Sequence, residues 1–295
     1  MNFVDERFEL TSLVFRLAGR EEFNSSQTKY QHNLAKEFSR FESHPAIQYT
    51  IKNLKFGGDA VFGIAVHLEK QGSSFALTNN IDAILSHQGG IVRWTQENIT
   101  AFVGLLNDFY KDTNFNDFYQ RHKKYYDKHN KRFEKTIYNR ISFDWFRKYG
   151  LNPDNLRIII SPSESRYGYG STVYGSTPKD NINYAGLAGI RLLYPFFLAF
   201  IVHEFCHAFA NPIASRWYYE NEAFRKWCDD SVNTERPNLY GYTDGHTMAL
   251  EYVTRSFTRL YMVENTGAAP SKQLGREKKA GFPHIDEVYE MVKMI

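Results

Sequence analysis

A five-residue motif contains the side chains best suited to catalysis. His203, Glu204 and His207 form the pattern H-E-x-x-H within the apolar segment from Phe200 to Pro212. On a helix, histidines four residues apart lie on one face, so both imidazoles can bind a single metal ion. Glu204 projects about 100° round the helix from His203, where its carboxylate can take a proton from a metal-bound water. The spacing predicts a hydrolase with one Zn²⁺ ion and Glu204 as its general base.

Chance accounts poorly for this motif. With ten histidines and nineteen glutamates in 295 residues, a random chain of this composition contains roughly 0.02 matches. The neighbours of the motif residues are uncharged, and burying two imidazoles and a carboxylate among them is costly unless a partner such as a divalent cation neutralises them. The alternative is a pair of core histidines with an ion-paired glutamate. Zinc is the expected metal, because imidazole and carboxylate ligands suit it.

A zinc site needs a third protein ligand and an open position for water. The metzincin continuation is absent, since Ala210 and Ile213 stand at its glycine and histidine positions. We expect the motif helix to end at Asn211-Pro212 and the third ligand to come from further along the chain. The acidic and histidine candidates there are Glu220, Glu222, Asp229, Asp230, Glu235, Asp244, His246 and Glu251.

Glu251 fits the third position best. Thr243-Asp244-Gly245 predicts a helix start, and the residues next to Glu251 are nearly all apolar, so this turn is expected to be buried. The alternative is an exposed ion pair between Glu251 and Arg255, four residues on. The predicted metal ligands are therefore His203, His207 and Glu251.

Peptide hydrolysis also needs a donor for the developing oxyanion besides the metal. Tyr242, His246 and Arg255 are the candidates nearest to Glu251 in sequence. For the glycine- and tyrosine-rich stretch from Tyr167 to Tyr174 we favour a turn-rich hairpin; the alternative is a substrate-facing loop, which would make it another candidate.

The elements that must position these residues indicate an α+β fold, predominantly helical with a small β-sheet. We expect a single zincin-like domain over residues 1–295, with a mainly helical half at 1–150 and the strand, motif helix and third-ligand helix at 151–295. The expected local features are a helix over Leu10–Ala18 stopped by Gly19, helix starts at His44-Pro45 and Thr95, a long helix over Asp117–Ile141 and a strand over Leu156–Ile160.

Composition excludes several classes of protein. Aromatic residues make up 16% of the chain, which argues against disorder, and two cysteines cannot build a disulfide framework or a four-thiolate zinc site. Between Arg121 and Lys148 there are ten Lys and Arg residues but only three acidic residues, so a basic helical nucleic-acid binder is one alternative function. We favour a solvated helix face and expect no nucleic-acid partner, because the net charge is only +3.

The sequence shows neither a secretory signal nor an apolar segment long enough to span a membrane. Acidic residues within Met1–Arg7 do not suit a secretory signal, and the apolar run Leu192–Val202 is too short to cross a bilayer. We therefore expect no membrane span. The chain as written suits the cytoplasm, or an exported protein if Met1 replaces a trimmed signal, and the sequence does not indicate an oligomeric state.

Three segments carry a resemblance to a known family: Glu9–Ala18, the motif running on to Asn211-Pro212, and Glu251–Arg255. The chain resembles an uncharacterised bacterial family of unknown function grouped with zincin-like metallopeptidases. The resemblance implies a gluzincin arrangement, with the third-ligand glutamate on a following helix, and a peptide or protein substrate. A non-catalytic metal- or protein-binding module on the same scaffold is the alternative, and the intact motif favours catalysis.

Overall fold

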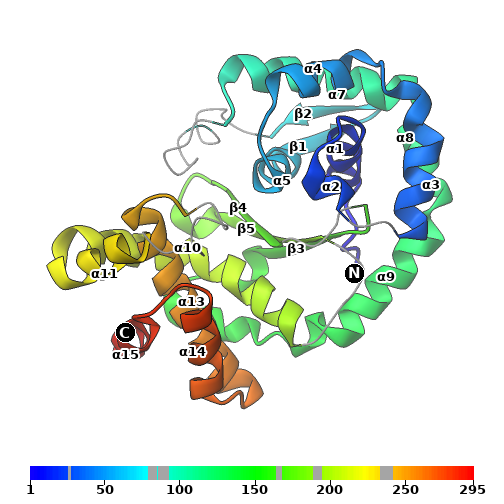
Figure 1. The fold of residues 1–295 in the computed structure, drawn as a ribbon. Coiled ribbons are helices and arrows are strands. Elements are labelled where there is room, and N and C mark those ends of the chain that lie inside the picture. The colour runs from blue at the N-terminus through cyan, green and yellow to red at the C-terminus, as the bar shows by residue number, and fades with distance from the viewer. Residues whose placement is uncertain (26–27, 79–84, 86–92, 164–167, 189–194, 233–241) are drawn as a thin grey trace. The chain divides into compact units, whose positions relative to one another are not determined.

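The computed structural model describes residues 1–295 except 26–27, 79–84, 86–92, 164–167, 189–194 and 233–241 (Figure 1). The chain forms two compact units: unit 1 is Met1–Arg140 with Leu156–Phe197, and unit 2 is Ile141–Asn155 with Leu198–Ile295. The described residues are mostly helical with small sheets, which agrees with the α+β expectation. The single zincin-like domain over 1–295 stays a prediction.

Unit 1 contains eight described α-helices, both sheets and the short 3₁₀ turns η1 (Ser39–Phe41), η2 (Tyr138–Arg140) and η5 (Pro178–Asp180). Local sequence signals set several of its helix ends. Gly19 adopts a left-handed φ of +75° and ends α1, the His44 side chain accepts from the Ala46 N–H at the start of α4, and Thr95 forms a capping box at the start of α7. The helices are α1 (Glu6–Leu17), α2 (Glu21–Asn24), α3 (Lys29–Phe38), α4 (Pro45–Asn53), α5 (Gly58–Val66), α7 (Gln96–Asp112), α8 (Phe115–Arg121) and α9 (Lys123–Thr136).

The prediction of one long helix over Asp117–Ile141 is wrong, because the helix is interrupted at His122. The His122 ring lies 4.1 Å from the Phe118 ring, and its backbone N–H is shared between the carbonyls of Phe118 and Tyr119. This tightened last turn ends α8, and the chain restarts as α9. Tyr126, in the first turn of α9, is 2% exposed.

The larger sheet of unit 1 has the strand order β3-β5-β4, with β5 between its neighbours (Figure 1). β3 (Leu156–Ser161) pairs in parallel with β5 (Ile182–Ala188), and β4 (Gly168–Val173) pairs antiparallel with β5. The predicted strand at 156–160 is thus confirmed. β1 (Leu68–Gln71) and β2 (Ser74–Leu77) form a separate antiparallel hairpin.

The described part of Tyr167–Tyr174 is mostly strand β4, which pairs antiparallel with β5, so the favoured hairpin is confirmed there and the alternative of a substrate-facing loop is wrong. Tyr169 is buried, and its ring packs 5.9 Å from that of Phe62 and 6.2 Å from that of Phe8. Apolar packing on α1 and α5 therefore outweighs the turn tendency of the glycines. Tyr167 lies outside the described residues.

A buried carboxylate joins α1 to the end of β3. Glu9 is 1% exposed; its Oε1 accepts from Ser161 Oγ at 2.6 Å and from Ser163 Oγ at 3.1 Å, and its Oε2 accepts from Tyr30 Oη at 2.8 Å. Burial raises the pKa of Glu9, and these hydrogen bonds oppose the rise. The opening segment of the resemblance is thus a core helix of unit 1.

Unit 2 is built around α13, which contacts α11, α14 and α15. Aromatic rings from the 3₁₀ turn η3 pack between α10 and α13: Phe146 lies 5.6 Å from Phe205, and Tyr149 stacks at 4.6 Å on Phe209. The elements of the unit are η3 (Phe143–Tyr149), η4 (Pro153–Asn155), α10 (Phe196–Glu220), α11 (Glu222–Val232), α13 (Gly245–Thr266), α14 (Pro270–Lys279) and α15 (Ile285–Lys293).

The motif helix does not end at Asn211-Pro212. α10 continues to Glu220 with Pro212 inside it, although proline removes one backbone hydrogen bond at a cost of roughly 3 kcal/mol. Buried residues on both sides of the proline, among them Phe209 and Ala214, hold the two halves in one core. Tertiary packing therefore overrides the local breaker.

By length and composition alone, α10 meets the criterion for a helix that crosses a membrane. The buried helix of a globular domain meets the same criterion, so this finding does not decide a location, and the expected lack of a membrane span stays a prediction.

Candidate metal centre

α10 presents two imidazoles side by side. The Nε2 atoms of His203 and His207 lie 3.2 Å apart, and the side chains are 15% and 24% exposed. One helical turn separates the two residues, which places both rings on the same face. Two ring nitrogens on partly exposed side chains thus lie next to one another.

α13 brings Glu251 to the same pair. The Asp244 side chain accepts from the Thr247 N–H and starts the helix, as the sequence predicts. Glu251 Oε2 lies 3.6 Å from His203 Nε2, and Oε1 lies 3.6 Å from His207 Nε2. Among the described residues, these three are the one group of His, Cys, Asp and Glu found close enough to hold a metal ion.

The spacing of the three ligands fits a tetrahedral zinc site. Zinc binds nitrogen and carboxylate oxygen at about 2.0–2.2 Å, so two corners of a tetrahedron lie about 3.3 Å apart. The two nitrogens lie 3.2 Å apart, and each oxygen of Glu251 lies 3.6 Å from a different nitrogen, so with one oxygen taken as the ligand the three ligand atoms lie within 4.8 Å of one another. The two nitrogens already have the spacing of neighbouring corners, and the carboxylate must move closer for one of its oxygens to complete the three ligands around one ion.

The outer nitrogen of His207 is held by two polar side chains. Its Nδ1 lies 2.9 Å from Asn211 Oδ1 and 3.2 Å from Thr254 Oγ1. The amide oxygen can only accept, which assigns the proton to Nδ1 and leaves the Nε2 lone pair facing the cluster. Sequence reasoning missed both partners, although Asn211, four residues after His207, shares its helix face.

The protonation states also suit metal binding. Burial lowers the pKa of His203, and the nearby charges of His207 and Arg255 lower it further, so the imidazole is neutral. Burial raises the pKa of Glu204 to about 7, while His207 and Arg255 act to lower it and Glu251 to raise it. Glu204 thus exchanges a proton readily near neutral pH, and a bound dication would bring its pKa down again.

Arg255 is engaged beside Glu251 rather than left open to a substrate. Its Nε donates to Glu251 Oε2 at 3.0 Å, one terminal nitrogen donates to Glu277 Oε2 at 2.8 Å, and the other to Tyr242 Oη at 3.2 Å. Sequence reasoning missed Glu277, because the run from Arg276 to Lys279 is highly charged and reads as surface.

Two predicted oxyanion donors differ in position. Tyr242 lies beside Glu251 and Arg255, and burial together with Glu251 raises its pKa, so its hydroxyl keeps its proton. His246 does not join the cluster; its Nε2 bonds to Ser215 Oγ at 2.9 Å. Ser215 follows His207 by eight residues, about 12 Å along the helix.

The other third-ligand candidates also lie outside the cluster. Among the residues that the structure describes, Glu220, Glu222, Asp229, Asp230 and Asp244 are not part of the metal-binding group, and Glu235 lies outside those residues. Asp229 accepts from Tyr218 Oη at 2.8 Å, and Asp244 caps α13. Each of these two acids has a local structural role.

Comparison with known families places the chain in one of them. The family described as a domain of unknown function (DUF4932) matches residues 5–294. The chain belongs to this family. No curated protein and no solved structure matches the chain. A family of unknown function is what the resemblance implies, but nothing in these comparisons links the DUF4932 family to the zincins, so the gluzincin assignment remains a proposal.

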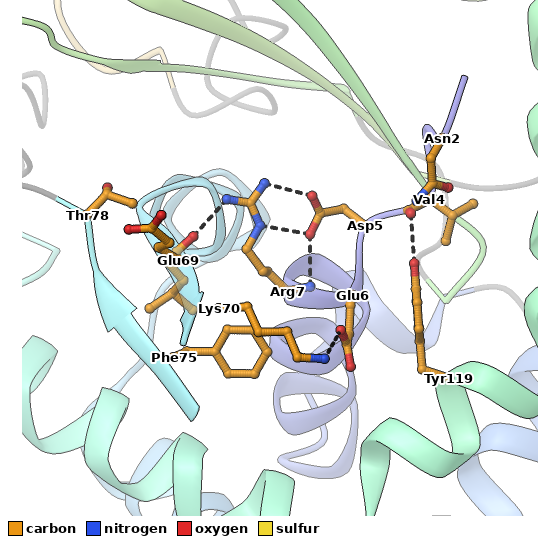
Figure 2. A pocket seen from close by; sticks show the side chains of 11 residues that line it. Asn2, Val4, Asp5, Glu6, Arg7, Glu69, Lys70, Phe75, Thr78 and Tyr119 are labelled. Atoms are coloured by element: carbon orange, nitrogen blue, oxygen red, sulfur yellow. Dashed lines mark hydrogen bonds and ion pairs between the residues drawn. The ribbon is translucent and has the colours of Figure 1, made fainter. Parts of the chain in front are cut away.

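The chain also has a pocket in unit 1, and its lining contains none of the motif residues. It has a volume of about 460 Å³, and Figure 2 shows its charged side chains. Arg7 donates hydrogen bonds to both carboxylate oxygens of Asp5, at 2.9 and 2.7 Å, and Lys70 Nζ lies 2.7 Å from Glu6 Oε2. These charges are paired with one another, so the pocket offers no ligand set comparable to the histidine cluster.

The basic stretch begins at the end of α8, runs through α9 and ends in η3, and all ten of its lysines and arginines are exposed. In α9 the interleaved Tyr126 and Phe133 are buried, and Tyr125 stacks at 4.8 Å on Tyr30. The rings are therefore occupied within unit 1 rather than available to stack on bases. This arrangement matches the solvated helix face that we favour.

Proposed function

We propose that this chain is a zinc-dependent peptidase of the gluzincin type, with His203, His207 and Glu251 as ligands and Glu204 as general base. The observation that carries the proposal is the meeting of two helices: two imidazole nitrogens 3.2 Å apart on one helix face a carboxylate on the other. Each oxygen of that carboxylate lies 3.6 Å from one nitrogen, and one ligand atom from each of the three residues lies within 4.8 Å of the others. Three ligands leave a fourth corner open, which is the hallmark of a catalytic rather than a structural site.

Zinc, when bound, polarises the scissile carbonyl and lowers the pKa of water at the site. The chain supplies the remaining parts. The carboxylate of Glu204 takes a proton from the attacking water and delivers it to the leaving amine. The hydroxyl of Tyr242, which keeps its proton and is hydrogen-bonded to Glu251, would serve as donor for the negative charge on the carbonyl oxygen by turning from Glu251 to that oxygen.

The neutral state of His203 supports this function, because a protonated imidazole cannot bind a metal. The proton on Nδ1 of His207 supports it too, since its partners orient the other nitrogen toward the ion. A non-catalytic metal-binding module needs these same ligands but has no use for Glu204.

Two measurements test the proposal. Elemental analysis of the purified chain should find one zinc per chain. A peptide library should be cleaved by the parent, and Glu204→Gln should bind zinc equally well but cleave on the order of 10²–10⁴-fold more slowly. Glu220→Gln, an exposed change on the same helix, is the matched control and should behave as the parent does.

The outcomes separate the two functions. Zinc binding without cleavage by the parent would favour the non-catalytic module. Equal cleavage by the parent and Glu204→Gln would refute the peptidase assignment.

A further inference from the structure

Arg255 is the centre of a buried polar network in unit 2. All three of its nitrogens donate hydrogen bonds, to Glu251, Glu277 and Tyr242. Its side chain is 17% exposed, and its guanidinium carbon lies 4.4 Å from the centre of the Phe282 ring. The guanidinium cannot turn without breaking several contacts at once.

Glu277 occupies the far side of this network. It is 3% exposed on α14, its Oε2 accepts from Arg255, and its Oε1 pairs with Arg259. Arg259 also donates to Oε1 of Gln273 at 2.8 Å, and Gln273 lies on α14, the helix that carries Glu277. Two carboxylates thus balance two guanidiniums, and both oxygens of Glu277 are used.

The near side of the network is the third ligand of the metal centre. Arg255 holds Oε2 of Glu251 at 3.0 Å, while Oε1 faces His207 Nε2 at 3.6 Å. A glutamate side chain without such a contact samples several rotamers and loses that freedom when it binds a metal. A carboxylate that is already held in place avoids this loss at the moment of binding.

We propose that Glu277 is a positioning residue for the metal centre. It fixes Arg255, and Arg255 keeps the carboxylate of Glu251 turned toward the two imidazoles. The inference rests on the proposed function, because it takes His203, His207 and Glu251 as the metal ligands. Glu277 itself touches neither the ligands' metal-facing atoms nor the space between them.

The test is the zinc affinity of the metal-free chain, measured by competition with a chromophoric chelator. Glu277→Gln should bind zinc about 10–100-fold more weakly than the parent, as is usual when an outer partner of a ligand is lost. Glu264→Gln is the matched control, since Glu264 lies on α13 but bonds to Trp145 and Lys148 instead. It should bind zinc as the parent does.

A second set of variants keeps the test valid if Glu277→Gln folds poorly, as the loss of a buried charge partner can cause. The double variant Glu277→Gln with Arg259→Met removes one anion and one cation and should regain most of the lost melting temperature. Because Arg255 still lacks its carboxylate partner, the zinc affinity should stay low. Arg259→Met alone retains the bond between Glu277 and Arg255 and should bind zinc within a few-fold of the parent.

The outcomes distinguish this inference from the proposed function. A parent chain that takes up no zinc refutes the metal centre itself. A parent that binds one zinc, together with a Glu277→Gln or double variant of equal affinity, overturns the positioning role and leaves the centre intact.

Discussion

Replacing Glu251 by glutamine separates its two roles, as partner of Arg255 and as metal ligand. The side chain is 10% exposed, and Arg255 donates to it at 3.0 Å. A hydrogen bond between charged groups contributes about 1.5–3 kcal/mol, so in excess chelator the variant should unfold with a free energy lower by about that amount. The amide keeps the shape of the side chain, which limits any change in packing.

Zinc should increase the difference in the free energy of unfolding between the parent and Glu251→Gln. A ligand that binds only the folded chain adds about 2.7 kcal/mol at a free concentration of 100 times Kd. The parent should gain this increment and Glu251→Gln should not, which makes the total difference about 4–6 kcal/mol in zinc.

Urea unfolding with chelator and with zinc measures both terms. Glu264→Gln, a like substitution on the same helix, should keep the full zinc increment. If zinc stabilises Glu251→Gln as much as the parent, the reasoning that makes Glu251 a ligand is refuted.

Three other perturbations give separate checks. Asn211→Ala removes the acceptor for His207 Nδ1 and should weaken zinc affinity about 10-fold in a chelator competition, whereas an unchanged affinity would mean that the amide does not orient the ring. Because burial raises the pKa of Glu9 in the folded state, its stabilisation is complete below the unfolded pKa and is lost as pH rises through the folded pKa. The stability of the parent relative to Glu9→Gln, from urea midpoints, should therefore fall as pH rises, and an increase would contradict the burial argument. His246→Ala should leave zinc affinity unchanged, because His246 bonds to Ser215 rather than to the cluster; a clear loss would place it at the metal.

Features that depend on a few neighbouring residues could be predicted from the sequence. The starts of α4, α7 and α13 follow from side chains that cap the first turn, and Gly19 ends α1 through its left-handed backbone. The pairing of the two motif histidines likewise follows from helical spacing alone.

Features that depend on distant packing could not be predicted in this way. Pro212 looks like a helix end, but buried residues on either side of it keep α10 continuous. Glu277 stands in a charged run that suggests surface, yet it is buried because Arg255 and Arg259 from another helix meet it. In both cases the deciding partner lies on an element that local patterns do not identify.

Glu251 lies between these two cases. Its apolar neighbours indicate burial, but nothing local says which face of α13 meets α10. Only the packing of α13 against α10 brings its carboxylate within 3.6 Å of each histidine.

The order of segments in unit 2 has a consequence for how the protein can be cut. The unit takes Ile141–Asn155 from one part of the chain and Leu198–Ile295 from another, with a segment of unit 1 between them. A fragment that starts at residue 198 would contain every candidate ligand but would lack η3, leaving Phe205 and Phe209 without the rings of Phe146 and Tyr149. The helix that carries both histidines thus depends on residues more than fifty positions earlier, and a metal-binding fragment needs both pieces, joined by a linker or supplied together.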